Sequence, residues 1–303
     1  MNTTLSRPLI AIDWGTSSLR GACFDVQGQQ QDARQFPRGI LTVPAGEFPA
    51  VFAQCFGEWL VQRPEALCLL SGMVGSRQGW QEAAYCPCPA GFAELGQHLL
   101  WLQPRRVAIF PGLSVQQHDG VAFAQHYVMR GEEVQIFGAL ALLGLQDATV
   151  VLPGTHSKWA QVVQGRVSGF RSFMTGEVYA LLSQHSILSR TLPADAPFHE
   201  GTFAEAVRLA QRSPSVLSSI FATRTLALFD TLPAKHHPSF LSGLLIGEEL
   251  RAMRPAHDAE LLLVGSSGLT SPYQVGLQTL GLQARCLGDE ATWAGHLALA
   301  RHL

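Results

Sequence analysis

Two short turns built from glycine and hydroxyl residues have the composition of phosphate-binding sites. The first turn is made by Gly15, Thr16, Ser17 and Ser18, and the second by Gly154, Thr155, His156 and Ser157. Such turns present backbone N–H groups and hydroxyls in concave arrays that bind phosphate oxygens. Nearly half of the 303 residues separate the two turns. This spacing indicates two related domains, whose turns would bind the phosphates of one nucleotide triphosphate.

Charged side chains accompany only the first turn. Asp13 ends the apolar run that precedes the turn, and Arg20 follows it. A carboxylate at this position would hold Mg²⁺, directly or through water, and Arg20 would add a charged fork to the phosphate oxygens. Leu152 stands in the second copy where the first has Asp13, so only the first half would hold the metal. The alternative is a plain hairpin with Asp and Ser as turn formers.

Two adjacent glutamates open a strongly apolar helical segment. Glu132 and Glu133 follow Gly131, and a purely structural role is open because the helix dipole favours carboxylates in a first turn. The functional interpretation is a general base that accepts the proton of a substrate hydroxyl during phosphoryl transfer. Neighbouring residues differ by about 100° around a helix, so at most one of the two should serve. We favour Glu133, and Asp119 is the next candidate.

Two further loops follow buried strands. One contains the adenosine-binding candidates Gly265, Ser266 and Ser267, whose small size lets a flat ring approach the backbone. The other contains the substrate-binding candidates Arg77, Gln78, Trp80 and Glu82, at a strand end where ligands of α/β proteins bind. Arg77 would suit the carboxylate of a sugar acid and Glu82 its hydroxyls. For both loops the alternative is an ordinary connection without a ligand.

Composition argues against several classes of partner. A net charge of −2 gives no bulk attraction for nucleic acid or an anionic membrane. No apolar run reaches the roughly 20 residues that span a bilayer, and the N-terminus lacks a secretory pattern. Six scattered cysteines favour free thiols. We therefore expect a cytoplasmic protein without nucleic acid or membrane partners.

Strands and helices alternate in both halves, which predicts an α/β fold. We expect an N-terminal domain over 1–137 and a C-terminal domain over 138–303, with the last helix packing back on the hinge. The expected strands include 18–25, 66–74, 106–110, 149–152 and 261–264. The expected helices include 48–61, 91–102, 132–145, one that Ser271 and Pro272 begin, and a final one that Asp289 caps.

The order of these motifs resembles that of the actin/hexokinase/Hsp70 superfamily. The residues 13–18, 154–155 and 265–267 are similar to its two phosphate motifs and its adenosine motif. Longer stretches resemble the 2-dehydro-3-deoxygalactonokinase family, and together the resemblance covers essentially the whole chain. These stretches are SGMVGSRQGWQEAAYCPCPA, MRGEEVQIFGAL, LPGTHSKWAQV, FMTGEVYALLSQHSIL and DEATWAGHLALA.

The resemblance implies two duplicated actin/hexokinase-like (ribonuclease H-like) domains around a nucleotide cleft. It implies a kinase that uses ATP and Mg²⁺ to phosphorylate the 6-hydroxyl of 2-dehydro-3-deoxy-D-galactonate in galactonate catabolism. In related carbohydrate kinases a Gly-Asp-Gln motif at a helix start carries the base, and Gly131-Glu132-Glu133 occupies a similar place here. The oligomeric state is left open, with a homodimer as one option.

Three other functions remain as alternatives. A kinase for another sugar or sugar acid would share every motif. A non-catalytic actin-fold protein that binds ATP would lack a polar loop such as 77–82. A transcriptional regulator on a sugar-kinase fold would need an N-terminal pair of DNA-binding helices, whereas the first expected strand begins near Pro8.

Overall fold

The computed structural model describes residues 4–117, 125–256 and 258–303. Its contacts divide the chain into two compact units. The first unit comprises Met1–Asp147, Gln161–Phe170 and Asp289–Leu303, and the second comprises Ala148–Ala160 and Arg171–Gly288. The domain limits expected from the sequence, 1–137 and 138–303, stay a prediction.

The main sheet of the first unit has six strands in the spatial order β3-β2-β1-β4-β7-β6. Their bounds are β1 Leu9–Trp14, β2 Leu19–Phe24, β3 Gln30–Phe36, β4 Leu67–Ser71, β6 Leu100–Gln103 and β7 Val107–Ile109. β1 pairs antiparallel with β2 and parallel with β4, and β4 pairs parallel with β7. β1 and β4 are apolar almost throughout because both faces of the sheet are covered. The carboxyl ends of these parallel strands therefore meet at one edge.

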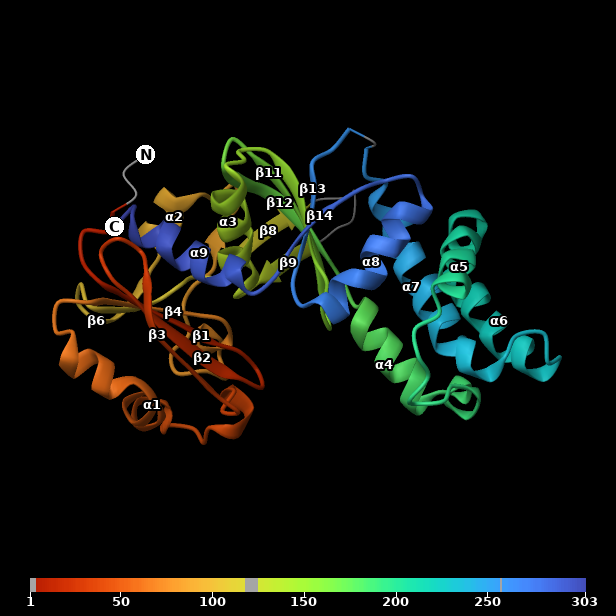
Figure 1. Ribbon diagram of the computed structural model, residues 1–303, viewed down its shortest axis with the longest axis horizontal. Coiled ribbons are helices and arrows are strands. Elements are labelled where there is room, and N and C mark those ends of the chain that lie inside the picture. Colours follow the sequence, from red (N-terminus) through yellow and green to blue (C-terminus); the bar gives the residue numbers. More distant parts are fainter. Residues whose placement is uncertain (1–3, 118–124, 257) are drawn as a thin grey trace. The chain divides into compact units, whose positions relative to one another are not determined.

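Helices lie on both faces of this sheet (Figure 1). α1 (Phe48–Gln62) packs Phe56 and Trp59 against the buried side of β1. α9 (Glu290–Ala300) contacts β1 and packs against α3 (Glu132–Leu143). Glycines make that contact close, since a Cβ on Gly138 or on Gly295 would collide with the main chain of the facing helix. The first unit thus ends on a helix from the C-terminus of the chain.

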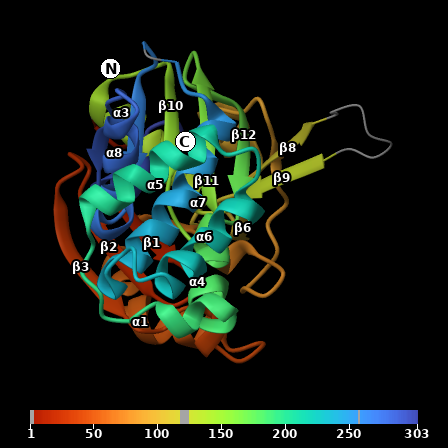
Figure 2. The same ribbon diagram turned by 90° about the vertical axis from the view of Figure 1, so that its right-hand side faces the viewer.

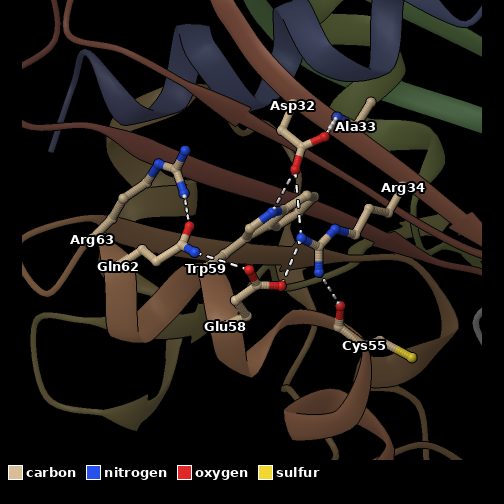
Figure 3. A network of polar contacts seen from close by, with 8 residues as sticks. All are labelled: Asp32, Ala33, Arg34, Cys55, Glu58, Trp59, Gln62 and Arg63. Carbon is tan, nitrogen blue, oxygen red and sulfur yellow. Dashed lines mark hydrogen bonds and ion pairs between the residues drawn. The ribbon is translucent and has the colours of Figure 1, made fainter.

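A polar network ties α1 to the edge strand β3 (Figure 3). The Trp59 indole donates to Asp32 at 2.8 Å, and Arg34 pairs with Glu58 at 3.0 Å. The Arg34 guanidinium also lies 4.7 Å from the centre of the Trp59 ring. These contacts hold α1 against β3, at the edge of the sheet.

A small helix and a second sheet complete the first unit. They are α2 (Phe92–Gln97) and the strands β5 (Cys86–Pro87), β8 (Leu113–Gln117) and β9 (Gln125–Met129), which are joined in the order β5-β8-β9. Figure 2 shows β8 and β9 as neighbouring arrows. β9 leads directly into Arg130 and α3, so this sheet fixes where α3 begins.

The sheet of the second unit has the order β12-β11-β10-β13-β14. Its strands are β10 Ala148–Leu152, β11 Ser157–Val163, β12 Arg166–Phe173, β13 Leu261–Val264 and β14 Arg285–Leu287. β10, β13 and β14 are parallel. In each sheet the first strand in the sequence lies between the second and the fourth. The repeat in the sequence is thus matched by a repeat in strand order.

Helices of the second unit are α4 (Thr175–His185), α5 (Glu200–Arg212), α6 (Val216–Leu228), α7 (His237–Met253) and α8 (Ser267–Thr279). α5 and α7 lie side by side in Figures 1 and 2. Phe203, Val207 and Leu250 join α5 and α7 to the buried strand β13 in one core. Short 3-10 helices occur at Ile40–Thr42, Met73–Gly75, Ile187–Thr191 and Ala234–His236.

Two expected elements differ from the structure. The helix predicted over 91–102 ends at Gln97, because 100–103 alternate between half-buried and exposed positions and pair antiparallel with β7. The helix predicted to begin at Ser271 begins at Ser267. The Ser266 carbonyl already accepts from Leu269 and Thr270 at 3.0 Å, and Pro272 lies inside the helix.

Two further findings concern the cysteines and the length of the helices. All six cysteines are free, as predicted. Across the described residues, no helix has both the length and the apolar character that a bilayer crossing requires.

Candidate active site

The first glycine-hydroxyl turn forms the tip of the β1–β2 hairpin. The Gly15 N–H donates to the Ser18 carbonyl at 2.9 Å, which closes the turn. Thr16 and Ser17 are exposed at its tip. Gly39 supports the turn from behind, because a Cβ there would collide with the main chain of Thr16 and Ser17. The turn therefore exposes Thr16 and Ser17 to solvent, whereas the Gly15 N–H is used within the turn.

Asp13 lies at the end of β1 and belongs to a group of alternating charges. Arg20 donates from Nε to the Asp13 carboxylate at 2.9 Å and pairs through Nη1 with Asp289 at 2.9 Å. Burial raises the pKa of the Asp13 carboxyl, and the charge of Arg20 opposes this rise. Asp289 was expected to cap the last helix, but its side chain makes no capping hydrogen bond and binds Arg20 instead. Two carboxylates thus flank one arginine.

A buried histidine lies behind Asp13. His296 of α9 is fully buried, and its Nε2 lies 2.9 Å from the Ser71 hydroxyl at the end of β4. Burial, followed by the charge of Arg20, lowers the pKa of His296 to about 3, so the ring is neutral at physiological pH. The Ser71 hydroxyl also donates to the Ile12 carbonyl at 3.4 Å, and Ser71 helps to lower the pKa of Asp13. His296 therefore ties α9 to the end of β4 beside Asp13.

The two glutamates at the start of α3 have different surroundings. Glu133 is fully buried, and its Oε2 accepts the Gly131 N–H at 2.7 Å. Its Oε1 is buried and has no hydrogen-bond partner among the described residues. Burial and the charge of Glu132 raise the pKa of Glu133 to about 8. Glu132 is half-buried and accepts the Arg130 N–H at 2.9 Å. Only Glu133 thus has an unpaired buried oxygen.

Gly72 and Gly131 bring the start of α3 close to Asp13. Both have positive φ, 89° and 104°. A Cβ on Gly131 would lie 3.2 Å from the Gly72 Cα, and a Cβ on Gly72 would lie 3.2 Å from Asp13 Oδ1. A larger residue at either position would therefore push the two segments apart. The glycines place the candidate base and the candidate metal ligand at the same edge of the sheet.

The loop after β4 lines two cavities of the first unit. Arg77 and Gln78 line both, and Trp80 lines the larger one, of about 500 Å³. The smaller, of about 330 Å³, has Glu82 and Arg130 in its wall, together with Met73, Ser76 and Tyr85. The Arg77 side chain is 86% exposed and pairs with Glu82 at 2.9 Å. The structure thus gathers the four predicted substrate residues in one loop and adds Arg130.

The second glycine-hydroxyl turn joins β10 to β11 in the second unit. Gly154 is half-buried and Thr155 is exposed, while the Glu177 N–H donates to the Thr155 carbonyl at 3.0 Å. His156 Nε2 lies 2.5 Å from the Glu177 carboxylate. Ser157 differs from the prediction that it faces phosphate, because its buried hydroxyl donates to Glu249 at 2.8 Å.

Glu249 of α7 is a buried carboxyl group that holds this turn to its surroundings. Besides Ser157, it accepts from the Trp159 indole at 2.6 Å, from the Tyr273 hydroxyl at 2.8 Å and from the Thr175 hydroxyl. These donors come from β11, α8 and α4. One side chain therefore fixes three elements around the second turn.

A cavity of about 330 Å³ in the second unit reaches from the second turn to Gly268, the residue after the predicted adenosine motif, although Gly265, Ser266 and Ser267 do not line it. Gly154 and Gly268 both line it, with an apolar wall that includes Leu245, Ile246 and Leu269. Ser266 and Ser267 form the start of α8 beside it, and Gly265 has a φ of +148°. A flat ring would fit such a cavity because its wall is largely apolar.

Sequence reasoning missed Arg130, Ser71, His296, Asp289 and Glu249 as site residues. Ser71, Arg130, Asp289 and His296 all lie inside stretches that were quoted for the resemblance. A polar residue within such a stretch was therefore the available signal. Glu249 had none, since it lies mid-helix far from either turn in the sequence. Asp119, the fallback base, lies outside the described residues.

Two sequence comparisons bear on the identity of this chain. A family model described as 2-keto-3-deoxy-galactonokinase matches residues 13–299. The 2-dehydro-3-deoxygalactonokinase of Escherichia coli (strain K12) is 35% identical over 295 residues, which cover 96% of this chain and 97% of that protein.

Solved structures show the same relation. A crystal structure of a protein from Sinorhizobium meliloti, assigned as a 2-dehydro-3-deoxygalactonokinase, has a TM-score of 0.88 and 34% identity, covering 97% of this chain and 98% of the other. The (R)-2-hydroxyglutaryl-CoA dehydratase component A of Acidaminococcus fermentans has a TM-score of 0.51 at 11% identity, covering 98% and 97%, and shows the fold alone. The expected actin/hexokinase-like α/β fold is confirmed.

Proposed function

Because this chain belongs to the 2-keto-3-deoxy-galactonokinase family, we propose that it transfers the terminal phosphoryl group of ATP to 2-dehydro-3-deoxygalactonate. The acceptor is the 6-hydroxyl, and the products are ADP and the 6-phosphate. The protein is thus a carbohydrate kinase, and a cytoplasmic location is part of the proposal.

The observation that carries the chemistry is the unpaired oxygen of Glu133. Phosphoryl transfer needs a carboxylate that accepts the proton of the attacking hydroxyl. A base works best when its pKa lies near the pH of the reaction, and the pKa of Glu133 is raised to about 8. Glu133 as the base therefore combines a raised pKa with an unpaired oxygen, and the fraction that is ionised and able to accept a proton grows as the pH rises toward 8. Glu132 would help by raising that pKa.

The two glycine-hydroxyl turns are proposed to bind the phosphates of ATP. Thr16 and Ser17 in the first turn and Thr155 in the second are exposed, so their hydroxyls can reach a ligand. The adenine ring would enter the apolar cavity between Gly154 and Gly268. Gly15, Ser18 and Arg20 would complete the first phosphate site, and His156 the second.

Mg²⁺ would be held by Asp13, with Asp289 as a second carboxylate. Mg²⁺ usually takes one or two carboxylates and completes its shell with water and substrate phosphates. The pair Asp13 and Asp289 on either side of Arg20 fits that donor set. Among the described residues no group of three or more His, Cys, Asp or Glu side chains could hold an ion alone. When bound, the ion supplies charge neutralisation at the phosphates.

Matched variants of the two glutamates test the base. Glu133→Gln should lower kcat about 10²- to 10⁴-fold, with ATP affinity nearly unchanged, because the phosphate contacts come from other loops. Glu132→Gln should lower kcat much less, since Glu132 contacts the main chain of Arg130. If both variants keep turnover within a few-fold of wild type, the base lies elsewhere.

The substrate is tested by ADP release over a panel of 2-keto-3-deoxy sugar acids and neutral sugars. The highest kcat/KM should belong to 2-dehydro-3-deoxygalactonate. A higher value for another sugar acid or a neutral sugar would make the protein a kinase of that compound. ATP binding without turnover on any member would favour a non-catalytic ATP-binding protein.

A further inference from the structure

Arg130 is a buried cation in the wall of the smaller cavity behind the loop 76–82. Its residue exposure is 8%. Nη2 donates to the Ala83 carbonyl at 2.8 Å, while Nε and Nη1 are buried and have no hydrogen-bond partner in the described part of the chain. A buried charged group without a partner is strongly destabilising. Such a guanidinium is therefore suited to an anion that arrives with a ligand.

The surroundings of Arg130 orient the guanidinium and leave space beside it. The Tyr85 ring lies 4.4 Å from its Cζ, which holds the guanidinium against an aromatic face. Position 75 is glycine, and a Cβ there would lie 3.0 Å from Nη1. The aromatic ring thus holds the guanidinium in one place, and the absence of a Cβ at position 75 leaves room for Nη1.

Ser76 provides a second unpaired donor in the same cavity. Its hydroxyl oxygen is buried and has no hydrogen-bond partner within the described residues, and both Ser76 and Arg130 line the cavity of about 330 Å³. A guanidinium and a hydroxyl together match the acceptor atoms of a carboxylate. A ligand without a negative charge would leave the charge of Arg130 without a counter-ion in this cavity.

Arg77, the residue expected to bind a carboxylate, has a different environment. Its side chain is 86% exposed and already pairs with Glu82 at 2.9 Å. An exposed ion pair contributes little, because water screens both charges. Arg130 instead has two buried nitrogens, Nε and Nη1, without a hydrogen-bond acceptor among the described residues, so the two arginines of this cavity differ in what they offer an anion.

We propose that Arg130, assisted by Ser76, binds the carboxylate of the sugar acid and makes the enzyme select acids over neutral sugars. This inference rests on the proposed function, since it assigns the carboxylate of the same substrate to this cavity. Glu133 follows Arg130 by three residues, so one short segment would bind the acid group and activate the hydroxyl. The Ser76 hydroxyl would donate to the second carboxylate oxygen.

The test compares the sugar acid with its neutral primary amide in wild type and in Arg130→Gln. A hydrogen bond to a charged group contributes roughly 1.5–3 kcal/mol, which corresponds to about 10- to 100-fold. Arg130→Gln should raise KM for the acid by this factor and leave kcat/KM for the amide nearly unchanged. Arg7→Gln is the matched control, because Arg7 also donates to a main-chain carbonyl but lines another cavity. It should leave the preference for the acid unchanged.

A second variant and a binding measurement keep the outcome decisive if Arg130→Gln folds poorly. Ser76→Ala should raise KM for the acid several-fold and leave the amide unaffected. Calorimetry without ATP measures binding of the acid itself, so it reports on the carboxylate site even if the wild type phosphorylates neither compound. Equal affinity for acid and amide in the wild type overturns the inference. So does a loss of the acid preference in Arg77→Gln but not in Arg130→Gln or Ser76→Ala.

Discussion

At the residue scale, the protonation of Glu133 links the site to stability. Burial raises the pKa of Glu133 from 4.5 to about 8. The unfolded chain loses this proton near pH 4.5, whereas the folded chain keeps it until about pH 8. The contribution of Glu133 to stability is therefore fully present below pH 4.5 and is lost as the pH rises to about 8.

Glu133→Gln keeps the shape of the side chain but removes this titration. The difference in Tm between the variant and the wild type should grow in favour of the variant from about pH 5 to about pH 8 and level off above. Thermal unfolding over this range measures it. A Tm difference that is constant with pH would mean that the pKa of Glu133 is not raised.

The residues of the site could be predicted from sequence only where the chain itself groups them. Gly15 to Ser18 and the pair of glutamates are adjacent in sequence, so their composition was visible. The meeting of Asp13 with Asp289 depends on strand order and on the return of the last helix. No spacing rule predicts such a contact. Burial distinguishes Glu133 from Glu132 as the candidate base, and the helical period of the sequence does not.

At the element scale, Glu249 should determine how firmly the second turn is held. Glu249→Ala would leave the buried donors of Trp159 and Tyr273 without an acceptor, and each unsatisfied group costs about 1–3 kcal/mol. We expect the free energy of unfolding to fall by about 3 kcal/mol or more in urea titration. Glu248→Ala removes the neighbouring carboxylate, which pairs with Arg251 at the surface, and should change it by less than about 1 kcal/mol. Similar losses in both variants would contradict this role.

Most elements could be predicted because their hydrophobic periods are clear. β2 and α1 lie within one residue of their expected ranges, 18–25 and 48–61, whereas β4 ends three residues before the expected 74. The failures occurred where two signals competed. Leu100 and Leu102 fit either a helix or an alternating strand, and pairing with β7 decides for the strand. The Ser271-Pro272 pair has the composition of a helix start, but the Ser266 carbonyl begins the helix one turn earlier.

At the scale of the whole molecule, the repeat predicts that both turns serve one nucleotide. Thr16→Ala and Thr155→Ala should each raise KM for ATP roughly tenfold or more, since each removes a hydrogen bond to a charged phosphate. KM for the sugar acid should change less. Thr279→Ala is the control, because its hydroxyl donates to the Val275 carbonyl within α8. If only one of the two variants raises KM for ATP, only one of the two turns binds the phosphates.

The duplication was visible in the sequence because each copy keeps the order strand, glycine turn, strand. The matching order of β3-β2-β1-β4 and β12-β11-β10-β13 has the same origin. The sequence also predicts that the last helix packs back on the hinge. In the structure Asp289–Leu303 belong to the first unit, where glycine contacts join α9 to α3.

This return of the C-terminus has a consequence for the synthesis of the protein. The ribosome delivers α9 only after the whole second unit, yet Gly295 and Ala291 are needed to cover α3. Until then Arg20 lacks Asp289, and Ser71 lacks His296. Domains usually fold as units while the chain emerges, but here the nascent first unit must wait, with an apolar helix face uncovered, until the second unit and α9 have emerged.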